Sequence, residues 1–110
     1  MAYRVEITRR VESDLEELYL WVIDRAPQQG AQWFNGLERA ILSLGRHPKR
    51  CPIAPDSFDP DQPVRVLTYG RKPHAYRIFF TVDDHAEVVR VLHVRRGVRQ
   101  RPLADELRDD

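Results

Sequence analysis

The sequence is poor in cysteine, in lysine and in long apolar runs, and each shortage excludes a class of protein. A single cysteine, Cys51, cannot form an internal disulfide or a paired-thiol metal site. The longest uninterrupted apolar run covers only the six residues 18–23, whereas a membrane-spanning helix needs about 20. No apolar run follows the first arginine, so we expect no secretory signal. We therefore expect a cytoplasmic protein without a membrane segment or a covalent cross-link.

Sequence motifs of common enzyme classes are also absent. The chain contains no glycine-rich phosphate-binding loop, no dinucleotide-binding fingerprint, no HExxH and no GxSxG. The four histidines are separated from one another and from Cys51 along the chain. We therefore predict neither a metal site nor a cofactor.

What the sequence does contain is an unusual distribution of positive charge. The 110 residues are 42% apolar and 32% charged, which fits one domain with a modest core. Of the 18 basic residues, 16 are arginine. Residues 62–101 carry nine basic and three acidic side chains, a net +6, and lie between two acidic segments. This distribution predicts a polyanion or an acidic peptide as a partner.

Periodicity predicts a strand, two helices and three further strands, in that order. An alternating segment predicts a strand over 3–7, and an apolar stripe from Val11 to Ala26 predicts a helix capped by Thr8. A second stripe over 31–44 follows a predicted break at 27–30. Further strands are expected at 64–69, 75–82 and 87–94, after a proline-rich loop over 48–63.

This order, β-α-α-β-β-β, predicts an α+β fold in a single domain over residues 1–110, with a polar tail from about residue 102. The last three strands can pair as an antiparallel meander, and the helical hairpin can cover one face of this mostly antiparallel sheet. The first strand would join the sheet through the helical crossover. Alternation along 75–82 should place Arg77 and Phe79 on the face away from the helices.

Basic side chains gather near the ends of the predicted strands, and we predict that they form an anion-binding or target-binding patch. Neighbouring strands bring side chains within roughly 5 Å of each other, so repulsion must be offset by a bound anion or by acidic groups. The alternative is a solvated strand end that is ionically paired with Asp56, Asp59, Asp61 or the acidic C-terminal tail. The candidates are Arg65, Arg71, Lys72, Arg77, Arg95, Arg96 and Arg99. Trp21 and Trp33 flank the apolar stripes and are predicted to pack in the core or between the helices.

Five stretches of the chain, in this order, resemble the RelE/ParE superfamily of type II toxin–antitoxin toxins. They are Thr8-x-x-Val11-x-x-Asp14-Leu15, the stripe Ala31-x-x-Phe34-x-x-Leu37-x-x-x-Ile41-x-x-Leu44 with Pro48 after it, Val64-Arg65-x-Leu67, Tyr76-Arg77-Ile78-Phe79-Phe80, and the segment from Val91 to Arg99. The resemblance implies a small toxin that forms a hetero-oligomer with its cognate antitoxin. It also implies one of two activities, ParE-like inhibition of DNA gyrase or RelE-like cleavage of mRNA on the ribosome.

The residues themselves favour the first activity. A RelE-like, metal-independent endoribonuclease would use Arg77, His93 and Arg96 as its catalytic residues, according to the resemblance. However, RelE-like sites often use lysines on the second strand and a tyrosine after the last strand. Residues 64–69 contain no lysine, and no aromatic residue follows Phe80. These departures favour a non-catalytic, ParE-like toxin, with the endoribonuclease as the alternative and a non-toxic relative as a third possibility.

Overall fold

A computed structural model describes residues 2–55, 57, 59–71 and 74–97 of the chain. The elements are β1 (Arg4–Ile7), α1 (Arg9–Arg25), α2 (Pro27–Leu42), the 3₁₀ turns η1 (Ser43–Gly45) and η2 (Pro48–Arg50), and then β2 (Arg65–Tyr69), β3 (Tyr76–Asp83) and β4 (Val88–Arg96). The order and the α+β class predicted from the sequence are confirmed. The predicted polar tail from about residue 102 lies outside the described residues.

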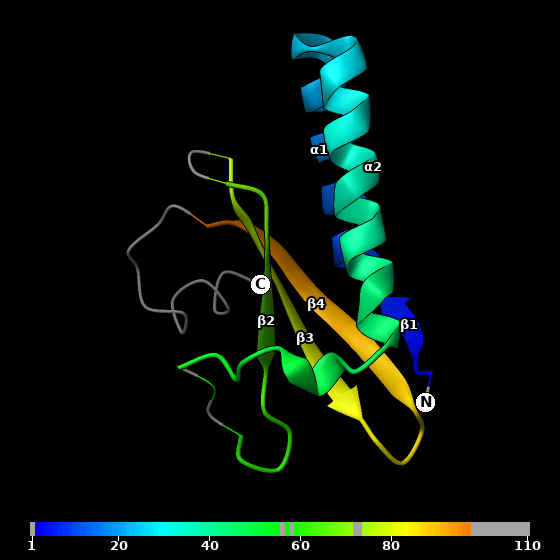
Figure 1. Cartoon of the computed structure of the whole chain (residues 1–110), viewed down its shortest axis with the longest axis vertical. Helices are drawn as coiled ribbons and strands as arrows, with labels where there is room; N and C mark the ends of the chain where they lie inside the picture. Colours follow the sequence, from blue (N-terminus) through cyan, green and yellow to red (C-terminus); the bar gives the residue numbers. More distant parts are fainter. Residues whose placement is uncertain (1, 56, 58, 72–73, 98–110) are drawn as a thin grey trace.

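One four-stranded sheet carries the fold, with the strand order β1-β4-β3-β2. Strands β2, β3 and β4 pair as an antiparallel meander, and β1 pairs in parallel with β4. A parallel pair needs a long crossover, and here the helical hairpin supplies it. In Figure 1 α1 lies behind α2; the two helices pack against each other, and α1 packs against β4.

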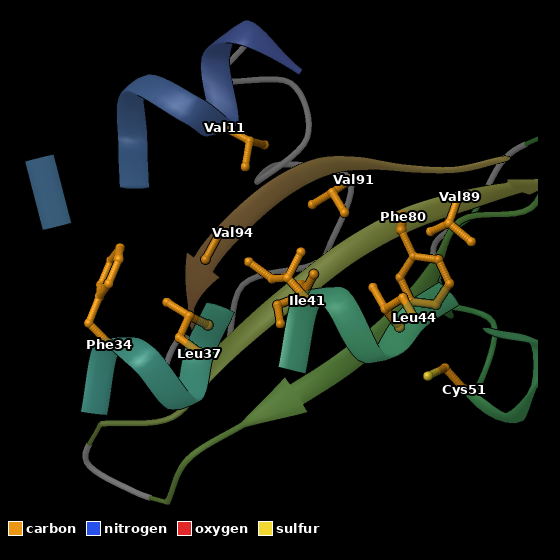
Figure 2. Packing of buried hydrophobic residues seen from close by; sticks show 11 residues of the cluster. Val11, Phe34, Leu37, Ile41, Leu44, Cys51, Phe80, Val89, Val91 and Val94 are labelled. Carbon is orange, nitrogen blue, oxygen red and sulfur yellow. The ribbon is translucent and has the colours of Figure 1, made fainter. Parts of the chain in front are cut away.

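The main core lies between this hairpin and the sheet. Leu37 and Leu44 are completely buried, as are Ile78 and Phe80 from β3 on the opposite side of the layer. Figure 2 shows Leu37 and Ile41 of α2 beside Val94 and Val91 of β4, with Val11 of α1 close to Val91. Burial of each of these side chains contributes about 1.5–3 kcal/mol, so this layer is the main source of stability.

The start and end of α1 follow local rules, but the predicted break at 27–30 is wrong. The Thr8 hydroxyl accepts a hydrogen bond from the Val11 amide at 3.2 Å, which confirms the predicted cap. Only Ala26 separates the two helices, and Pro27 is the first residue of α2. The fixed φ angle of proline suits the first turn of a helix. The first residue of a helix has no intrahelical acceptor for its N–H, so proline loses no helix hydrogen bond there. Proline here begins a helix without an intervening loop.

Gly30 allows the two helices to approach closely at this tight connection. A Cβ at this position would lie 2.6 Å from the carbonyl oxygen of Val22 in α1 and 2.9 Å from its carbonyl carbon. Both are backbone atoms, so no side-chain rotation could relieve the contact. The glycine that the sequence alone indicates as part of a helix break is instead buried inside α2.

An irregularity between β3 and β4 decides which residues of β4 face the helices. Phe79 pairs with His93, but the next residue, Phe80, pairs with Val91, so Leu92 is an extra residue in β4. Strict alternation cannot place both Val91 and Val94 on one face, because they are three residues apart. This β-bulge does so, and both valines belong to the main core.

The second face of the sheet has a smaller apolar cluster. Phe79 is completely buried there and packs with Ala54, Val64 and Val66. The backbone of the proline-rich segment lies along the start of β2, where the Ala54 amide donates to the Val64 carbonyl at 2.8 Å. The described part of this segment is therefore an ordered surface loop, as predicted.

We expect Gly30→Ala to destabilise the fold by about 1–3 kcal/mol, the usual cost of overpacking a tight contact. In an ordinary helix interior the same change stabilises by roughly 0.5–1 kcal/mol, because glycine has more backbone entropy to lose. Urea denaturation of both proteins measures the difference in the free energy of unfolding. Gln32→Ala, an exposed change in the same helix, is the matched control and should stay within about 0.5 kcal/mol of the original protein. A stabilised Gly30→Ala protein would contradict the proposed role of the helix contact.

Candidate functional site

Three of the predicted site residues lie on the face of the sheet away from the helices. Arg77 in β3 pairs directly with Arg95 in β4, and Phe79 pairs with His93. Directly opposed residues share a face with Cβ atoms about 4.5–5.5 Å apart. The Arg77 guanidinium carbon lies 5.7 Å from the centre of the Phe79 ring. We call Arg77, His93 and Arg95 the open-face cluster; His93 in it is only 9% exposed, and both arginines are half-buried.

Arg96 belongs to the opposite face. Its partner in the register is Tyr76, whose ring contacts Trp33 of α2 with the ring centres 5.3 Å apart. Arg96 therefore projects on the side of the helices, at the edge of the main core. The prediction that Arg77, Arg95 and Arg96 would converge in one patch is wrong for Arg96, because successive residues of a strand point to opposite faces.

Arg65 also lies apart from the open-face cluster. It pairs with Phe80, which faces the helices, and its Nη1 donates to the carbonyl oxygens of Cys51 at 2.7 Å and Lys49 at 3.3 Å. Arg65 thus holds the loop after η2 against the sheet. Arg71 is exposed at the turn between β2 and β3. Lys72 and Arg99, the other two predicted residues, lie outside the described residues.

Basic side chains of β1, β4 and η2 are engaged with carboxylates. Glu6 accepts hydrogen bonds from Arg4 at 3.0 Å and from Arg90 at 3.3 Å. The bond from Arg4, with a smaller contribution from Arg90, holds the pKa of Glu6 below its ordinary value. Lys49 donates to Asp84, and this bond is the main cause of the lowered pKa of the Asp84 carboxyl. These two groups neutralise charge at the β1 edge and at the turn between β3 and β4.

A pocket of about 290 Å³ lies beside Arg96. Its lining includes Trp21 and Arg25 of α1, Trp33 of α2, Tyr76 and Arg96, and we call this site the Trp–Arg pocket. The Arg25 guanidinium lies 3.9 Å from the centre of the Trp21 ring, and its Nη1 donates to the Trp21 carbonyl oxygen at 3.3 Å. These two contacts hold the cation over the aromatic ring.

The sequence prediction for the two tryptophans is half right. Trp33 packs against the main core, and its ring contacts both Tyr69 and Tyr76. Trp21, in contrast, is 46% exposed at the mouth of the pocket. Arg25 and Tyr76 were not among the predicted site residues. The signal for Arg25 was its position four residues after Trp21, which places both on one side of a helix.

A second and larger hollow of about 550 Å³ lies on another side of the helical hairpin. Its apolar lining includes Leu20 and Tyr19, which are 67% and 40% exposed. The charged residues among its described lining are Glu12, Glu16 and Glu38. We call it the helix groove. Its charge is opposite in sign to that of the Trp–Arg pocket.

The described residues provide no metal-binding cluster, since none of their His, Cys, Asp and Glu side chains form groups of three or more that could hold an ion. Cys51 is buried, and this burial raises the pKa of its thiol above the ordinary value. Neither described helix combines the length and the hydropathy that a membrane crossing requires.

Comparison with known proteins identifies the family. The model of the ParE toxin of the type II toxin–antitoxin system parDE matches residues 5–101. The chain belongs to this toxin family. A search of curated proteins finds no match to the toxin.

Solved structures confirm the fold of the toxin. The chromosomal ParDE toxin–antitoxin system from P. aeruginosa contains a chain with 20% identity and a TM-score of 0.66, over 86% of the toxin and 96% of that chain. A double mutant of E. coli toxin RelE in the free state has 17% identity and a TM-score of 0.62, over 99% and 93% of the two chains. The archaeal RelE–RelB complex from Pyrococcus horikoshii OT3 has 20% identity and a TM-score of 0.56, over 90% and 99%. The fold is therefore that of the RelE/ParE superfamily.

The two carbonyl contacts of Arg65 predict that this side chain contributes to stability. We expect Arg65→Lys to lower the free energy of unfolding by about 1 kcal/mol, because lysine keeps the charge but cannot reproduce the planar fork. Chemical denaturation measures the change. Arg71→Lys, an exposed control on the neighbouring turn, should have no measurable effect. Equal stability of the Arg65→Lys protein and the original would show that the carbonyl contacts contribute nothing.

Proposed function

We propose that the toxin acts without catalysis, by ParE-like inhibition of DNA gyrase, and that a cognate antitoxin neutralises it. The match to the ParE toxin family supports the choice of target class. The observation that carries the proposal is the division of the arginines between the two faces of the sheet. Of the three residues that the resemblance assigns to a RelE-like nuclease, Arg77 and His93 share the open face, but Arg96 lies on the other face.

The chemistry of RNA cleavage makes this division important. Attack by a 2′-hydroxyl needs a base, an acid and cations that all act on the same phosphate. Arg77 and His93 lie on the open face, whereas Arg96 lies on the side of the helices. His93 is only 9% exposed. Histidine is the side-chain type in this cluster that commonly carries protons in catalysis. A proton shuttle must reach its substrate, and so little exposed surface argues against that role for His93.

Target binding makes weaker demands on geometry. On this proposal, Arg77 and Arg95 contribute positive charge of the kind that binds an acidic protein patch or a phosphate backbone. We propose that Arg71, at the turn between β2 and β3, also belongs to the target-binding surface. Lys72 and Arg99 remain predicted contributors from the sequence. Arg65 is set aside, because it binds loop carbonyls.

The structural neighbours support the proposed partner. The P. aeruginosa structure is described as a ParDE toxin–antitoxin system and the P. horikoshii structure as a RelE–RelB complex. By analogy the toxin forms a hetero-oligomer with its own antitoxin. Gyrase is a cytoplasmic target, and we place the toxin in the cytoplasm on the same proposal.

The alternative is a RelE-like, ribosome-dependent mRNA endoribonuclease. The observation in its favour is that Arg77 and His93 occupy the same face on adjacent strands, as a phosphate-binding group and a proton carrier would. Arg95 would then replace Arg96 as the second cation.

His93→Gln discriminates between the two activities. A general acid or base contributes typically about 100- to 10,000-fold to a rate, so a nuclease should lose nearly all activity with this change. We expect the variant to retain gyrase inhibition within about threefold, because a binder needs no proton transfer at this position. The measurement is plasmid supercoiling by purified gyrase, run beside mRNA cleavage in a ribosome-dependent translation reaction.

The controls address folding and specificity. His85→Gln, at the exposed turn between β3 and β4, should behave as the original toxin in both assays. Thermal denaturation of the His93→Gln protein must show one cooperative transition, since His93 is buried. If the original toxin cleaves mRNA on the ribosome and the folded His93→Gln variant does not, the toxin is an endoribonuclease. Inactivity of the original toxin in both assays would indicate a non-toxic relative.

A further inference from the structure

The Trp–Arg pocket combines aromatic walls with two cations, and none of the described residues that line it is acidic. It contains both tryptophans of the chain. It also contains Arg25 from α1 and Arg96 from the end of β4, whereas the described residues that line it include no aspartate or glutamate. Two fixed positive charges near one apolar hollow create a field that favours a negative group.

The pocket is also built rigidly on its helical side. Gly30 lies in its lining, and the close contact with Val22 that Gly30 permits brings α1 and α2 together there. Arg25 is held over Trp21 by the stacking contact and the hydrogen bond to the Trp21 carbonyl. A guanidinium oriented in advance loses less conformational entropy when it binds a carboxylate.

Size and ring packing favour a peptide over a nucleic acid. A volume of about 290 Å³ lies at the small end of ligand pockets, roughly 300–1,000 Å³, and suits one or two side chains. Base stacking requires an open aromatic face. Arg25 covers one face of Trp21, and Trp33 is engaged with Tyr69 and Tyr76. Aliphatic and aromatic side chains can fill the remaining apolar space without stacking.

We infer that the Trp–Arg pocket binds an acidic peptide segment of a partner protein, in which an apolar anchor fills the hollow and adjacent carboxylates pair with Arg25 and Arg96. Interfaces rich in tryptophan, tyrosine and arginine commonly concentrate binding energy in this way. The helix groove cannot serve the same segment, because Glu12, Glu16 and Glu38 would repel its carboxylates. The identity of the partner as the antitoxin rests on the proposed function, but the chemistry of the segment does not.

The experiment uses the purified toxin and three blocked hexapeptides with the same central Leu-Phe pair. The flanking residues are Asp and Glu in the first peptide, Asn and Gln in the second, and Lys in the third. The readout is the pair of indole N–H resonances in ¹⁵N-labelled toxin, which single Trp→Phe variants assign to Trp21 and Trp33. We expect the acidic peptide to shift both resonances and to bind about tenfold more tightly than the neutral peptide at low salt. The difference should shrink as salt is added.

A matched pair of variants tests the role of the two cations. The double change Arg25→Gln and Arg96→Gln should reduce the affinity for the acidic peptide to that for the neutral one. The double change Arg9→Gln and Arg39→Gln removes the same charge from exposed positions of α1 and α2 that do not line the pocket. This control should keep the preference for the acidic peptide, apart from a small general loss of electrostatic attraction.

Four results would overturn the inference. The first is equal affinity for the acidic and neutral peptides, and the second is peptide binding that leaves the indole resonances unchanged. The third is tighter binding of a single-stranded hexauridylate that shifts the same indole resonances. The fourth is a shift of these resonances that depends on toxin concentration in the absence of peptide. The third would assign the pocket to nucleic acid and the fourth to a second copy of the toxin. If gyrase inhibition and neutralisation are observed but the peptide fails, only this inference is lost. If the peptide binds but the toxin is inactive, only the proposed function is lost.

Discussion

The β-bulge at Leu92 is the constraint on which the arrangement of the toxin depends. It shifts the pairing of β4 by one residue, so that Val91 and Val94 both enter the core under the helices. The same shift fixes the face of every later residue in the strand. His93 and Arg95 lie on the open face, and Arg96 lies on the side of the helices. One extra residue therefore decides both the packing of the core and the placement of the cations.

The arginines of β3 and β4 are divided between two surfaces, which reduces the repulsion that three adjacent guanidinium groups on one face would cause. Arg77 and Arg95 remain paired on the open face, while Arg96 contributes instead to an aromatic pocket with Arg25. A pleated strand places neighbouring side chains on opposite faces, so adjacent arginines in the sequence can serve different partners. On the proposals made above, the open face meets the target and the Trp–Arg pocket meets the antitoxin.

Much of the fold could be predicted from the sequence, because it depends on local periodicity. The apolar stripes located both helices, the Thr8 cap located the start of α1, and alternation correctly assigned Phe79 to the open face. The errors involve tertiary contacts. The prediction treated Gly30 as part of a break, although the contact with Val22 buries it within α2. The single arginine patch failed at Arg96, since the register of β3 and β4 depends on a bulge that periodicity does not reveal, and Arg65 was not expected to bind loop carbonyls.

The measurement that tests this account most directly compares two paired substitutions in two assays. Arg77→Ala with Arg95→Ala removes the open-face cations, and Arg25→Ala with Arg96→Ala removes those of the Trp–Arg pocket. The assays are gyrase inhibition and affinity for the cognate antitoxin. The account predicts that the first pair loses inhibition and keeps antitoxin affinity, and that the second pair keeps inhibition and loses antitoxin affinity. Equal losses in both assays for both pairs would contradict a division of function between the two faces of the sheet.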